Sequence, residues 1–559
     1  MLCLLNMLNR AQLTSYCTRT RGRATNMQDN THDVVIVGAG PVGLALGRML
    51  GLRGHDVVIV ERWPEPYPLP RAVHFDDEIG RVFQSMRLTE EVESISEAVP
   101  DCYEWRNAAG EALVRIDWSG NGPNGWPTAS FFSQPQLEKV LAEAVATMPN
   151  VTLLRGAEVV GIDEGADDVV VTFTSTIVKQ RQVRARFVVG CDGANSFVRE
   201  RMGATMHDEG FFFDWLIVDT IPLDDCEWAP QNWQLCDPAR PTTVVSGGPG
   251  RRRWEFMRLP GETREELNTP EKAWELLREW DRTPENSELE RHAVYTFAAR
   301  WADRWNSGRL AIAGDAAHQM PPFAGQGMCS GIRDAANLSW KLDRVLRGES
   351  DLALLDSYSS ERNVHLQHAV TMSVELGRVI CVLDMEKATE RDVRMIDGGA
   401  DPAKVLPVTA LPVLGDGVTA QDTHGGALRG TLAPQFPVRI GAHSDLLDEV
   451  TGFGSVLLVL GDTDVAHSDP TLQRLLAGTG VRLKTVEESG APDLLDATGR
   501  WTRWFRGQNI SAVLVRPDHY IFGAVTDNTQ LTDLLSEYRN RLQILDPSPT
   551  SLHPASTTV

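Results

Sequence analysis

Two short, uninterrupted apolar runs at residues 34–37 and 57–60 flank a helix-like segment. Apolar runs of this length are typical of parallel strands that are buried on both faces. The segment between them, 44–52, consists mainly of apolar helix formers, and Gly54 is suited to end a helix. Residues 33–62 are therefore predicted to form a strand–helix–strand unit.

A glycine-rich turn with the spacing G-x-G-x-x-G joins the first strand of this unit to its helix. In this pattern Gly38 permits a tight turn, Gly40 lets the backbone approach a pyrophosphate, and Gly43 lets the helix pack on the strand. The unpaired N–H groups of the helix N-terminus suit phosphates. Glu61 at the end of the second strand suits a ribose without a 2′-phosphate. The unit predicts a dinucleotide site and leaves FAD and NAD as alternatives.

The pattern of apolar and polar positions predicts further strands and helices through the first half of the chain. We expect a hairpin formed by residues 158–162 and 169–173. The Pro-rich stretch 63–70 is predicted to be a loop. The other predicted elements are a helix over 76–86, strands within 102–116, a helix over 134–145 and a strand over 151–154.

Two more predicted buried strands are each followed by an acid beside a glycine. Residues 187–189 lead into Asp192-Gly193, and residues 309–313 lead into Gly314-Asp315. An acid in this position lies at the carboxyl edge of an α/β sheet, where such sheets bind ligands. A second glycine-rich loop then precedes a long helix that is predicted over residues 328–346.

The middle of the chain has a different composition. Residues 211–259 are rich in aromatic residues and arginine and contain strand-like runs, which predicts an antiparallel sheet. Arg251, Arg252 and Arg253 are predicted to form a solvated cluster, with an anion site as the alternative. His318 is predicted to be a structural histidine rather than a catalytic one.

The last third of the chain is predicted to be helical at first and then to form a separate unit. Helices are expected over 352–372 and 375–385, and the Pro/Gly-rich stretch 397–416 is expected to be a linker. Strands and helices between residues 430 and 538 predict a small α/β domain. The Ser/Thr/Pro-rich end, 546–559, is predicted to be disordered.

The charge and cysteine content exclude several classes of function. Acids outnumber bases by 76 to 54 among 559 residues, which gives a net charge of −22. Such a chain repels nucleic acid and anionic lipid surfaces, so neither is an expected partner. The eight cysteines include no C-x-x-C pair, so neither a zinc site nor a dithiol site is predicted. No apolar run reaches the length of a membrane span, and a reduced, cytoplasmic protein fits best.

The first residues are left out of the predicted fold. Residues 1–26 carry four arginines and no acid, as a transit-like segment would. The alternative, which we favour, is that translation begins at Met27, just ahead of the first predicted strand.

The G-x-G-x-x-G unit, Asp192-Gly193 and Gly314-Asp315 together resemble the motifs of the single-component FAD-dependent aromatic hydroxylases. The resemblance covers residues 33 to about 400. It implies an α/β fold with a Rossmann-like FAD domain and an inserted antiparallel-sheet substrate domain. The run from Arg516 to Tyr520 resembles part of the C-terminal thioredoxin-like α/β domain of larger members.

The resemblance also implies roles for particular residues. The first motif binds the ADP half of FAD, Asp192 supports both FAD and the nicotinamide cofactor, and Gly314-Asp315 contacts the ribityl chain. A helix N-terminus near Gly325 would stabilise the negative charge of a reduced flavin. The residues assigned to FAD in this way are Gly38, Ala39, Gly40, Pro41, Val42, Gly43, Glu61, Arg62, Arg71, Gln134, Val159, Asp192, Gly314, Asp315, Gly325, Gly327 and Met328.

These observations give a prediction for the division of the chain. The substrate sheet is expected mainly within 101–130 and 205–295. The predicted segments are an extension over 1–32, an FAD-binding monooxygenase region over 33–400, a linker over 401–429, a thioredoxin-like domain over 430–545 and a tail over 546–559.

Further runs, among them 70–78 and 236–241, resemble the hydroxylases of 3-(3-hydroxyphenyl)propionate and 3-hydroxycinnamate. The resemblance implies that NADH reduces FAD and that O₂ then hydroxylates a phenolic acid ortho to its hydroxyl. A resorcinol-type phenol, a chlorophenol or a polyketide ring is the alternative substrate. We hypothesise that Arg240, Arg252 or Arg253 pairs with the substrate carboxylate. The sequence identifies no catalytic base, and a homodimer is implied by the resemblance alone.

Two functions of other classes are alternatives to this one. The chain could be a flavin-binding module whose last domain docks a partner, which the full set of motifs disfavours. It could also be an NAD-dependent dehydrogenase that uses only the first unit, which a yellow purified protein would exclude.

Overall fold

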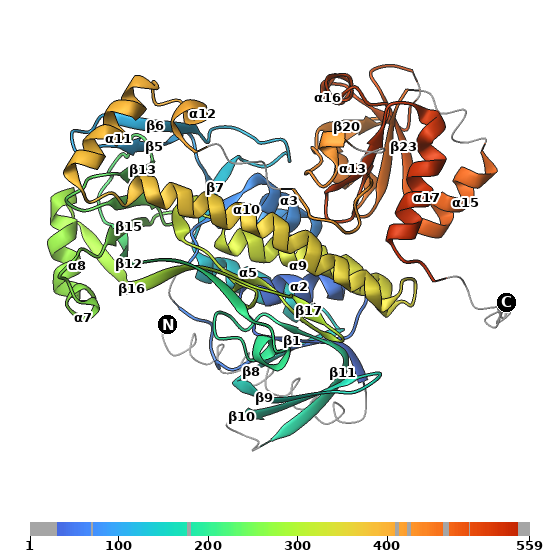
Figure 1. The fold of residues 1–559 in the computed structure, drawn as a ribbon, viewed down its shortest axis with the longest axis horizontal. Helices are drawn as coiled ribbons and strands as arrows, with labels where there is room; N and C mark the ends of the chain where they lie inside the picture. Colours follow the sequence, from blue (N-terminus) through green and yellow to red (C-terminus); the bar gives the residue numbers. More distant parts are fainter. Residues whose placement is uncertain are drawn as a thin grey trace, which may run out of the picture.

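The two strands of the predicted strand–helix–strand unit are inner strands of an eight-stranded sheet (Figure 1). The computed structural model describes residues 31–68, 71–175, 180–407, 413–421, 426–461, 469–490 and 492–545. Strand β1 (Thr31–Val37) pairs in parallel with β2 (Val57–Glu61) and with β11 (Arg181–Gly190). Helix α2 (Pro41–Leu52) joins β1 to β2, which confirms the predicted unit. The helix begins earlier than predicted, because proline suits the first helical position.

The rest of this first sheet brings three predicted motifs to one edge. Its main path runs β17-β18-β11-β1-β2-β8, and β9 and β10 extend it beside β11 as the predicted antiparallel hairpin. Because β1, β11 and β18 are parallel, the glycine-rich turn, Asp192 and Gly314 all follow strand ends on the same edge. The strands are β8 (Val151–Arg155), β9 (Ala157–Glu164), β10 (Val169–Ser175), β17 (Asn306–Ser307) and β18 (Leu310–Ile312).

A second eight-stranded sheet has the order β19-β16-β12-β15-β14-β13-β5-β6. Its neighbours are antiparallel, as predicted, except that β13 and β5 pair in parallel. The strands are β5 (Cys102–Arg106), β6 (Ala112–Asp117), β12 (Met206–Pro222), β13 (Asn232–Leu235), β14 (Thr242–Ser246), β15 (Arg252–Met257), β16 (Ser287–Ala302) and β19 (His318–Gln319).

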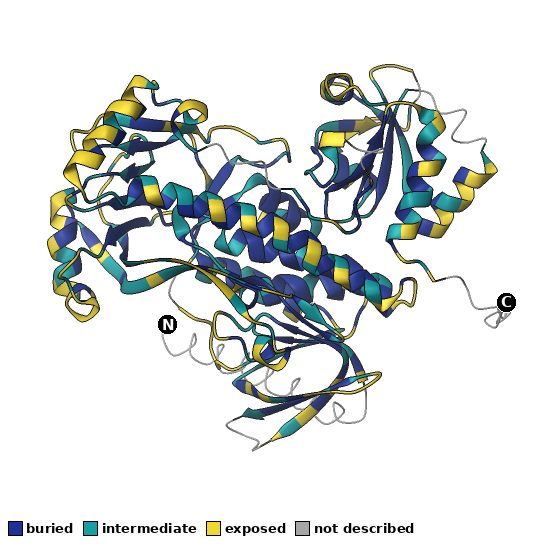
Figure 2. Cartoon of the chain, in the orientation of Figure 1, coloured by how far each residue is buried: buried dark blue, intermediate teal, exposed yellow. Residues whose placement is uncertain are grey.

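Two long helices run through the middle of the molecule. Helix α9 (Gly327–Leu346) confirms the predicted long helix, and it is mostly buried. Helix α10 (Asp356–Ile380) is continuous, so the break predicted between residues 372 and 375 is wrong. The polar residue at that point is accommodated inside the fold, because the buried Ser373 hydroxyl donates a hydrogen bond to the Pro321 carbonyl at 2.6 Å. Figure 2 shows α10 with exposed residues along one side and buried residues along the other.

The C-terminal part of the chain forms a seven-stranded sheet of order β21-β20-β24-β23-β22-β25-β26, at the upper right in Figure 1. The predicted α/β fold class is confirmed. The predicted ends of the FAD-binding region at residue 400 and of the linker before residue 430 stay a prediction. The predicted tail, 546–559, and residues 1–30 of the predicted N-terminal extension lie outside the described residues. The strands are β20 (Pro437–Ile440), β21 (His443–Leu446), β22 (Val456–Leu460), β23 (Arg482–Glu487), β24 (Leu494–Leu495), β25 (Ala512–Val515) and β26 (Ile521–Val525).

The remaining elements connect these sheets. A small sheet has the order β3-β7-β4. It consists of β3 (His74–Asp76), β4 (Ser96–Ala98) and β7 (Ala129–Phe132). The other helices are α3 (Asp77–Ser85), α4 (Thr89–Glu93), α5 (Gln134–Ala146), α6 (Phe197–Arg201), α7 (Arg264–Leu267), α8 (Pro270–Leu277), α11 (Met385–Asp397), α12 (Pro402–Val405), α13 (Leu447–Thr451), α15 (Pro470–Thr479), α16 (Arg500–Gln508) and α17 (Leu531–Arg541). The 3₁₀ turns are η1 (Arg278–Trp280), η2 (Gly314–Ala316), η3 (Pro322–Ala324), η4 (Leu352–Leu355), η6 (Gly426–Leu428) and η7 (Asn528–Gln530).

Within the described ranges no single helix is long and apolar enough to cross a membrane, although one sharply bent pair, 352–380 with 385–397, passes by length and composition.

Candidate active site

The three glycines of the first motif differ in what surrounds them. Gly38 has φ of +105°, and an added Cβ would lie 2.3 Å from the Cys191 carbonyl oxygen. A Cβ on Gly43 would lie 2.1 Å from the Gly38 carbonyl oxygen. A Cβ on Gly40, by contrast, would have no atom of the described chain within 4 Å. Gly38 and Gly43 therefore close the turn on itself, whereas Gly40 leaves backbone accessible to a ligand.

The helix that follows presents free backbone donors to this open space. Gly40 is the N-cap of α2, and among the described residues no side chain caps the helix. Its first N–H groups are therefore available to an anion. The Glu61 carboxylate lies against the turn, because it accepts hydrogen bonds from the Ala39 N–H at 2.8 Å and the Trp63 N–H at 2.9 Å. The structure thus brings Glu61 to the glycine-rich turn, as the sequence predicts.

Asp192 follows β11 and holds the start of helix α6. Its carboxylate accepts hydrogen bonds from the Ser196 hydroxyl at 2.6 Å and from the N–H groups of Phe197 at 2.7 Å and Val198 at 3.1 Å. Burial raises the pKa of Asp192, and these hydrogen bonds oppose that rise. The acid therefore orders the edge of the first sheet through contacts with its own loop.

The Gly314-Asp315 motif lies directly against the first motif. Gly314 has φ of +63°, and a Cβ there would be 2.9 Å from the Val42 side chain. A Cβ on Gly331 of α9 would be 2.5 Å from the same side chain and 3.0 Å from Gly314 Cα. The first motif, the Gly314-Asp315 motif and the first turns of α9 thus meet at Val42. Asp315 is exposed there, yet desolvation by the surrounding protein raises the pKa of its carboxyl.

The loop before α9 supplies a second uncapped helix N-terminus. Gly325 has φ of +64° and closes η3, and Gln326 is the N-cap of α9. No side-chain hydrogen bond caps this helix within the described chain, and a Cβ on Gly327 would have no neighbour within 4 Å. Two helix N-termini with open glycines fit the negatively charged parts of FAD, its pyrophosphate and its reduced ring.

The other residues assigned to FAD are held by different contacts. Gln134 is buried, and its side-chain oxygen accepts a hydrogen bond from the Ala72 N–H at 2.7 Å. The exposed Arg71 guanidinium lies 4.8 Å from the centre of the Tyr67 ring. Val159 is buried in β9. The structure therefore brings Gln134 next to the Arg71-Ala72 segment. Arg62 is exposed, and Met328 is half-buried in the first turn of α9.

Aromatic side chains on one face of the second sheet meet the loop before α9. Phe323 of this loop contacts Trp215 of β12 edge-on, with ring centres 5.6 Å apart. Nearby, Trp118 stacks on Tyr103 at 4.7 Å and on His74 at 5.3 Å. Burial lowers the pKa of His74, so its ring is neutral at neutral pH. This aromatic wall suits an aromatic substrate beside the flavin loops.

The prediction of a solvated arginine cluster is wrong for two of its three members. Arg252 and Arg253 are only 2% and 3% exposed, because β15 lies inside the second sheet between β12 and β14. Arg253 donates two hydrogen bonds to Asp219 at 2.7 and 3.0 Å. Arg252 lies over the Trp228 ring at 4.2 Å on the opposite face. Arg251 is half-buried and pairs with Glu290 at 3.1 Å.

The third arginine of the carboxylate hypothesis also has a partner of opposite charge. Arg240 donates to both oxygens of Glu262, at 2.6 and 3.0 Å. His318, by contrast, confirms its predicted structural role. It is buried, and its Nε2 lies 2.6 Å from the Asp334 carboxylate.

Sequence reasoning missed two buried charged residues, Arg291 and Glu255, which lie on the same sheet face as Arg253. Arg291 of β16 is 3% exposed, and its nearest carboxylate oxygen, of Asp219, is 3.6 Å away. In the part of the chain that the structure describes, none of its guanidinium nitrogens makes a hydrogen bond. Burial raises the pKa of the neighbouring Glu255. The alternation of inward and outward residues along β15 and β16 is the signal that places both on this face.

Comparison with known proteins identifies two matching families. Residues 31–373 match the FAD binding domain family, and residues 430–541 match the HcaD C-terminal domain. A probable NADH-specific resorcinol 4-hydroxylase of Rhodococcus jostii is 39% identical over 510 residues, which covers 90% of this chain and 94% of that protein. A 3-(3-hydroxy-phenyl)propionate/3-hydroxycinnamic acid hydroxylase of Escherichia coli is 32% identical over 520 residues, which covers 89% and 92%.

Solved structures show the same fold. The flavin-dependent monooxygenase PieE, in complex with FAD and substrate, has a TM-score of 0.78 at 22% identity and covers 92% of this chain and 100% of its own. Aklavinone-11 hydroxylase, in complex with FAD and aklavinone, has a TM-score of 0.73 at 24% identity, with coverage of 92% and 100%. The shared fold therefore includes the C-terminal sheet.

Proposed function

Because the chain belongs to the family of FAD-dependent aromatic hydroxylases, we propose that it uses NADH and O₂ to hydroxylate a neutral, resorcinol-type phenol. In this reaction NADH and a proton provide the electrons and hydrogen that convert one oxygen atom of O₂ to water. The other oxygen atom enters the ring as a hydroxyl group. Bound FAD supplies the electron transfer and the oxygen chemistry, whereas the protein supplies binding, orientation and a dry site.

A neutral substrate is favoured because two of the arginines that are predicted to bind the substrate carboxylate are already paired with acids of the protein. Arg253 is neutralised by Asp219, and Arg240 by Glu262. A substrate carboxylate buried beside either arginine would compete with its acid for the same donors. Since a buried charge without its own partner is costly, these arginines favour a substrate that carries no charge.

The sequence comparison supports the same choice. The relative with 39% identity is named for resorcinol and for NADH, whereas the 32% relative is named for phenolic acids. The aromatic wall formed by Trp118, Tyr103 and Phe323 would exclude water from the ring. The proposal also includes that the residues assigned to FAD from the sequence contact the cofactor, that the protein is a homodimer and that it is cytoplasmic.

A second substrate, 3-(3-hydroxyphenyl)propionate, is favoured by one specific observation. The buried guanidinium of Arg291 makes no hydrogen bond within the described residues, and it shares a sheet face with the aromatic wall. A substrate carboxylate would satisfy those donors. The two candidates differ in charge, so one assay separates them.

The test measures NADH oxidation by the purified, FAD-loaded protein with resorcinol, with 3-(3-hydroxyphenyl)propionate and without either. Products are identified by chromatography and mass. We expect resorcinol to accelerate NADH oxidation and to yield a trihydroxybenzene in an amount close to the NADH consumed.

Each other outcome has a definite meaning. Stimulation and a dihydroxylated product with only the propionate would overturn the resorcinol assignment in favour of the second candidate. Stimulation by resorcinol without product would mean that it promotes flavin reduction but is not the substrate. A response to neither compound would reject both substrates and leave the family assignment intact.

A further inference from the structure

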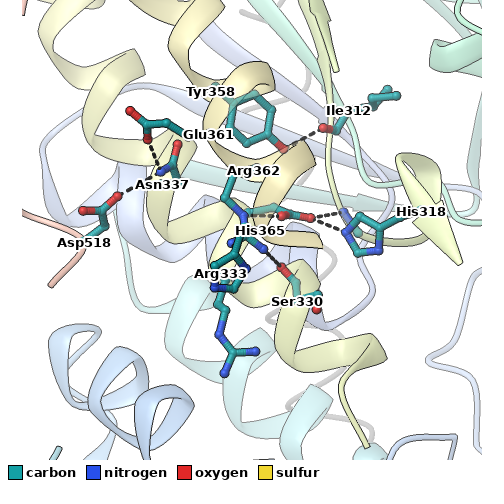
Figure 3. Close-up of polar contacts among 12 residues, drawn as sticks. Ile312, His318, Ser330, Arg333, Asn337, Tyr358, Glu361, Arg362, His365 and Asp518 are labelled. Atoms are coloured by element: carbon teal, nitrogen blue, oxygen red, sulfur yellow. Dashed lines mark hydrogen bonds and ion pairs between the residues drawn. The ribbon is translucent and has the colours of Figure 1, made fainter. Parts of the chain in front are cut away.

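A buried polar network joins the C-terminal sheet to the core of the FAD-binding region. The Arg516 guanidinium donates hydrogen bonds to Glu361 of α10 at 2.7 Å and to Asp518 at 2.6 Å. Asn337 of α9 donates to the same two acids, at 2.8 and 3.0 Å (Figure 3). Arg516 and Glu361 are completely buried. The segment 516–520 is therefore fixed against α9 and α10.

The hydroxyl group of Tyr520 lies at a junction of this network. Tyr520 is 4% exposed. Its oxygen is 3.2 Å from His365 Nε2, and its O–H donates to Glu78 at 2.7 Å. Arg362 lies 2.8 Å from His365 Nδ1. An arginine only donates, so Nδ1 accepts and the ring proton lies on Nε2, which then donates to Tyr520.

One branch from Tyr520 ends on the Gly314-Asp315 motif. From His365 it passes to Arg362, which donates to the Asp334 carboxylate at 2.8 Å. Asp334 in turn accepts the Gly314 N–H at 3.0 Å. The His318 Nε2 lies 2.6 Å from the same Asp334 carboxylate, at the oxygen that Arg362 does not contact. The position of the Gly314 backbone is thus linked to the C-terminal sheet through four side chains.

The other branch ends on the loop before α9. Glu78 accepts a hydrogen bond from Arg333 at 2.6 Å. Arg333 also donates to the side-chain oxygen of Gln326 at 2.7 Å and to Asp76 at 2.5 Å. Gln326 lies between Gly325 and Gly327 and is the N-cap of α9. Both branches therefore end on segments that the sequence assigns to FAD.

We propose that Tyr520 is a positioning residue for FAD, because its hydroxyl group links the two flavin-binding loops that begin at Gly314 and Gly325. The C-terminal sheet in this way takes part in flavin binding through this network of side chains. Loss of the hydroxyl would leave a buried N–H on His365 and an oxygen on Glu78 unpaired. The two loops would then be less ordered before FAD binds, and binding would have to order them.

The test compares Tyr520→Phe with Tyr538→Phe as the matched control. Tyr538 is also a buried tyrosine of the C-terminal part, but its hydroxyl pairs with Ser455 at 2.8 Å, outside both branches. For each full-length variant the dissociation constant of FAD is measured by titrating the apoprotein with FAD and following flavin fluorescence. The thermal midpoint of the apoprotein and the visible spectrum of the bound flavin are recorded in parallel.

We expect Tyr520→Phe to weaken FAD binding about tenfold, which corresponds to ~1.4 kcal/mol, and to shift the flavin spectrum. Tyr538→Phe should leave both unchanged even if it lowers the thermal midpoint. Equal FAD affinity and spectrum in wild type and Tyr520→Phe would overturn the proposal, as would equal weakening in both variants. His365→Leu breaks the first branch at the next residue and replaces Tyr520→Phe if that variant does not fold. None of these measurements depends on the substrate.

Discussion

Neighbouring arginines of the second sheet differ in their freedom to bind a ligand, because adjacent residues of a strand point to opposite faces. On β15, Arg252 points toward Trp228, whereas Arg253 points toward Asp219. Arg291 lies opposite Asp219 on β16 and shares that face, at a longer distance from the carboxylate. The position of an arginine in the alternating pattern of its strand, rather than the number of arginines in the sequence, therefore decides whether it faces the aromatic wall.

This arrangement predicts the effect of Arg291→Gln. If 3-(3-hydroxyphenyl)propionate is the substrate, the variant should raise its KM by roughly ten- to a hundredfold, because a charge-assisted hydrogen bond contributes ~1.5–3 kcal/mol. KM for resorcinol should change little, since a neutral phenol does not need the charge. Arg251→Gln is the control, because Arg251 is paired with Glu290. Equal changes for both substrates, measured by steady-state NADH oxidation, would show that Arg291 is only structural.

At the scale of elements, the strand–turn–helix unit makes substitutions at two nearby glycines, Gly40 and Gly43, behave differently. Gly40→Ala meets no atom of the described chain and has an ordinary φ of −74°. It should leave the thermal midpoint of the apoprotein unchanged but weaken FAD binding, because the methyl group occupies space that the pyrophosphate needs. Gly43→Ala places a Cβ 2.1 Å from the Gly38 carbonyl and should cost ~1–3 kcal/mol of stability.

Thermal unfolding of both apoproteins and FAD titration of each check this prediction. If Gly40→Ala bound FAD as tightly as wild type, the turn would not approach the phosphates. If Gly43→Ala were as stable as wild type, the turn would have relaxed away from the contact that the structure shows.

The elements that could be predicted from sequence are those with a local signal. Each strand of the first unit is an apolar run, its turn requires glycine, and its helix begins at proline, so the strand–turn–helix–strand unit follows from about thirty consecutive residues. The continuity of α10 and the burial of Arg253 have no such signal. They depend on the Pro321 carbonyl and on Asp219, which are supplied by distant segments.

At the scale of the whole molecule, buried ion pairs hold the C-terminal sheet on the FAD-binding region. Arg81 donates to both oxygens of Asp448, 367 residues away, and Arg516 donates to Glu361, 155 residues away. Charged residues at such separations give no local pattern, so neither the docking nor the network at Tyr520 could be predicted from the sequence. The motif residues were identified one by one, but the contact of Gly314 and Gly331 with Val42 required the structure.

Glu361 provides the strongest test of this docking, because it is a buried acid between two buried cations. Burial alone would raise the pKa of Glu361, but Arg516 and Lys341 outweigh burial and lower it to about 2. A folded-state pKa below the ordinary value of 4.5 means that the carboxylate stabilises the protein above pH 4.5. This contribution is lost as the pH falls from 4.5 toward 2.

Glu361→Gln should therefore lower the free energy of unfolding at pH 7 by ~3–5 kcal/mol, since it leaves the buried Lys341 without its acid and leaves Arg516 with Asp518 alone. Its stability should also fall less steeply than that of wild type between pH 4.5 and pH 2. Glu375→Gln is the control on the same helix, because Glu375 pairs with the exposed Arg378 and should change stability by less than ~1 kcal/mol. Chemical denaturation of the apoproteins across this pH range measures both effects. Parallel pH profiles for wild type and Glu361→Gln would show that the ion pairs do not hold the two parts together, and that apolar contacts between the sheets and helices are sufficient.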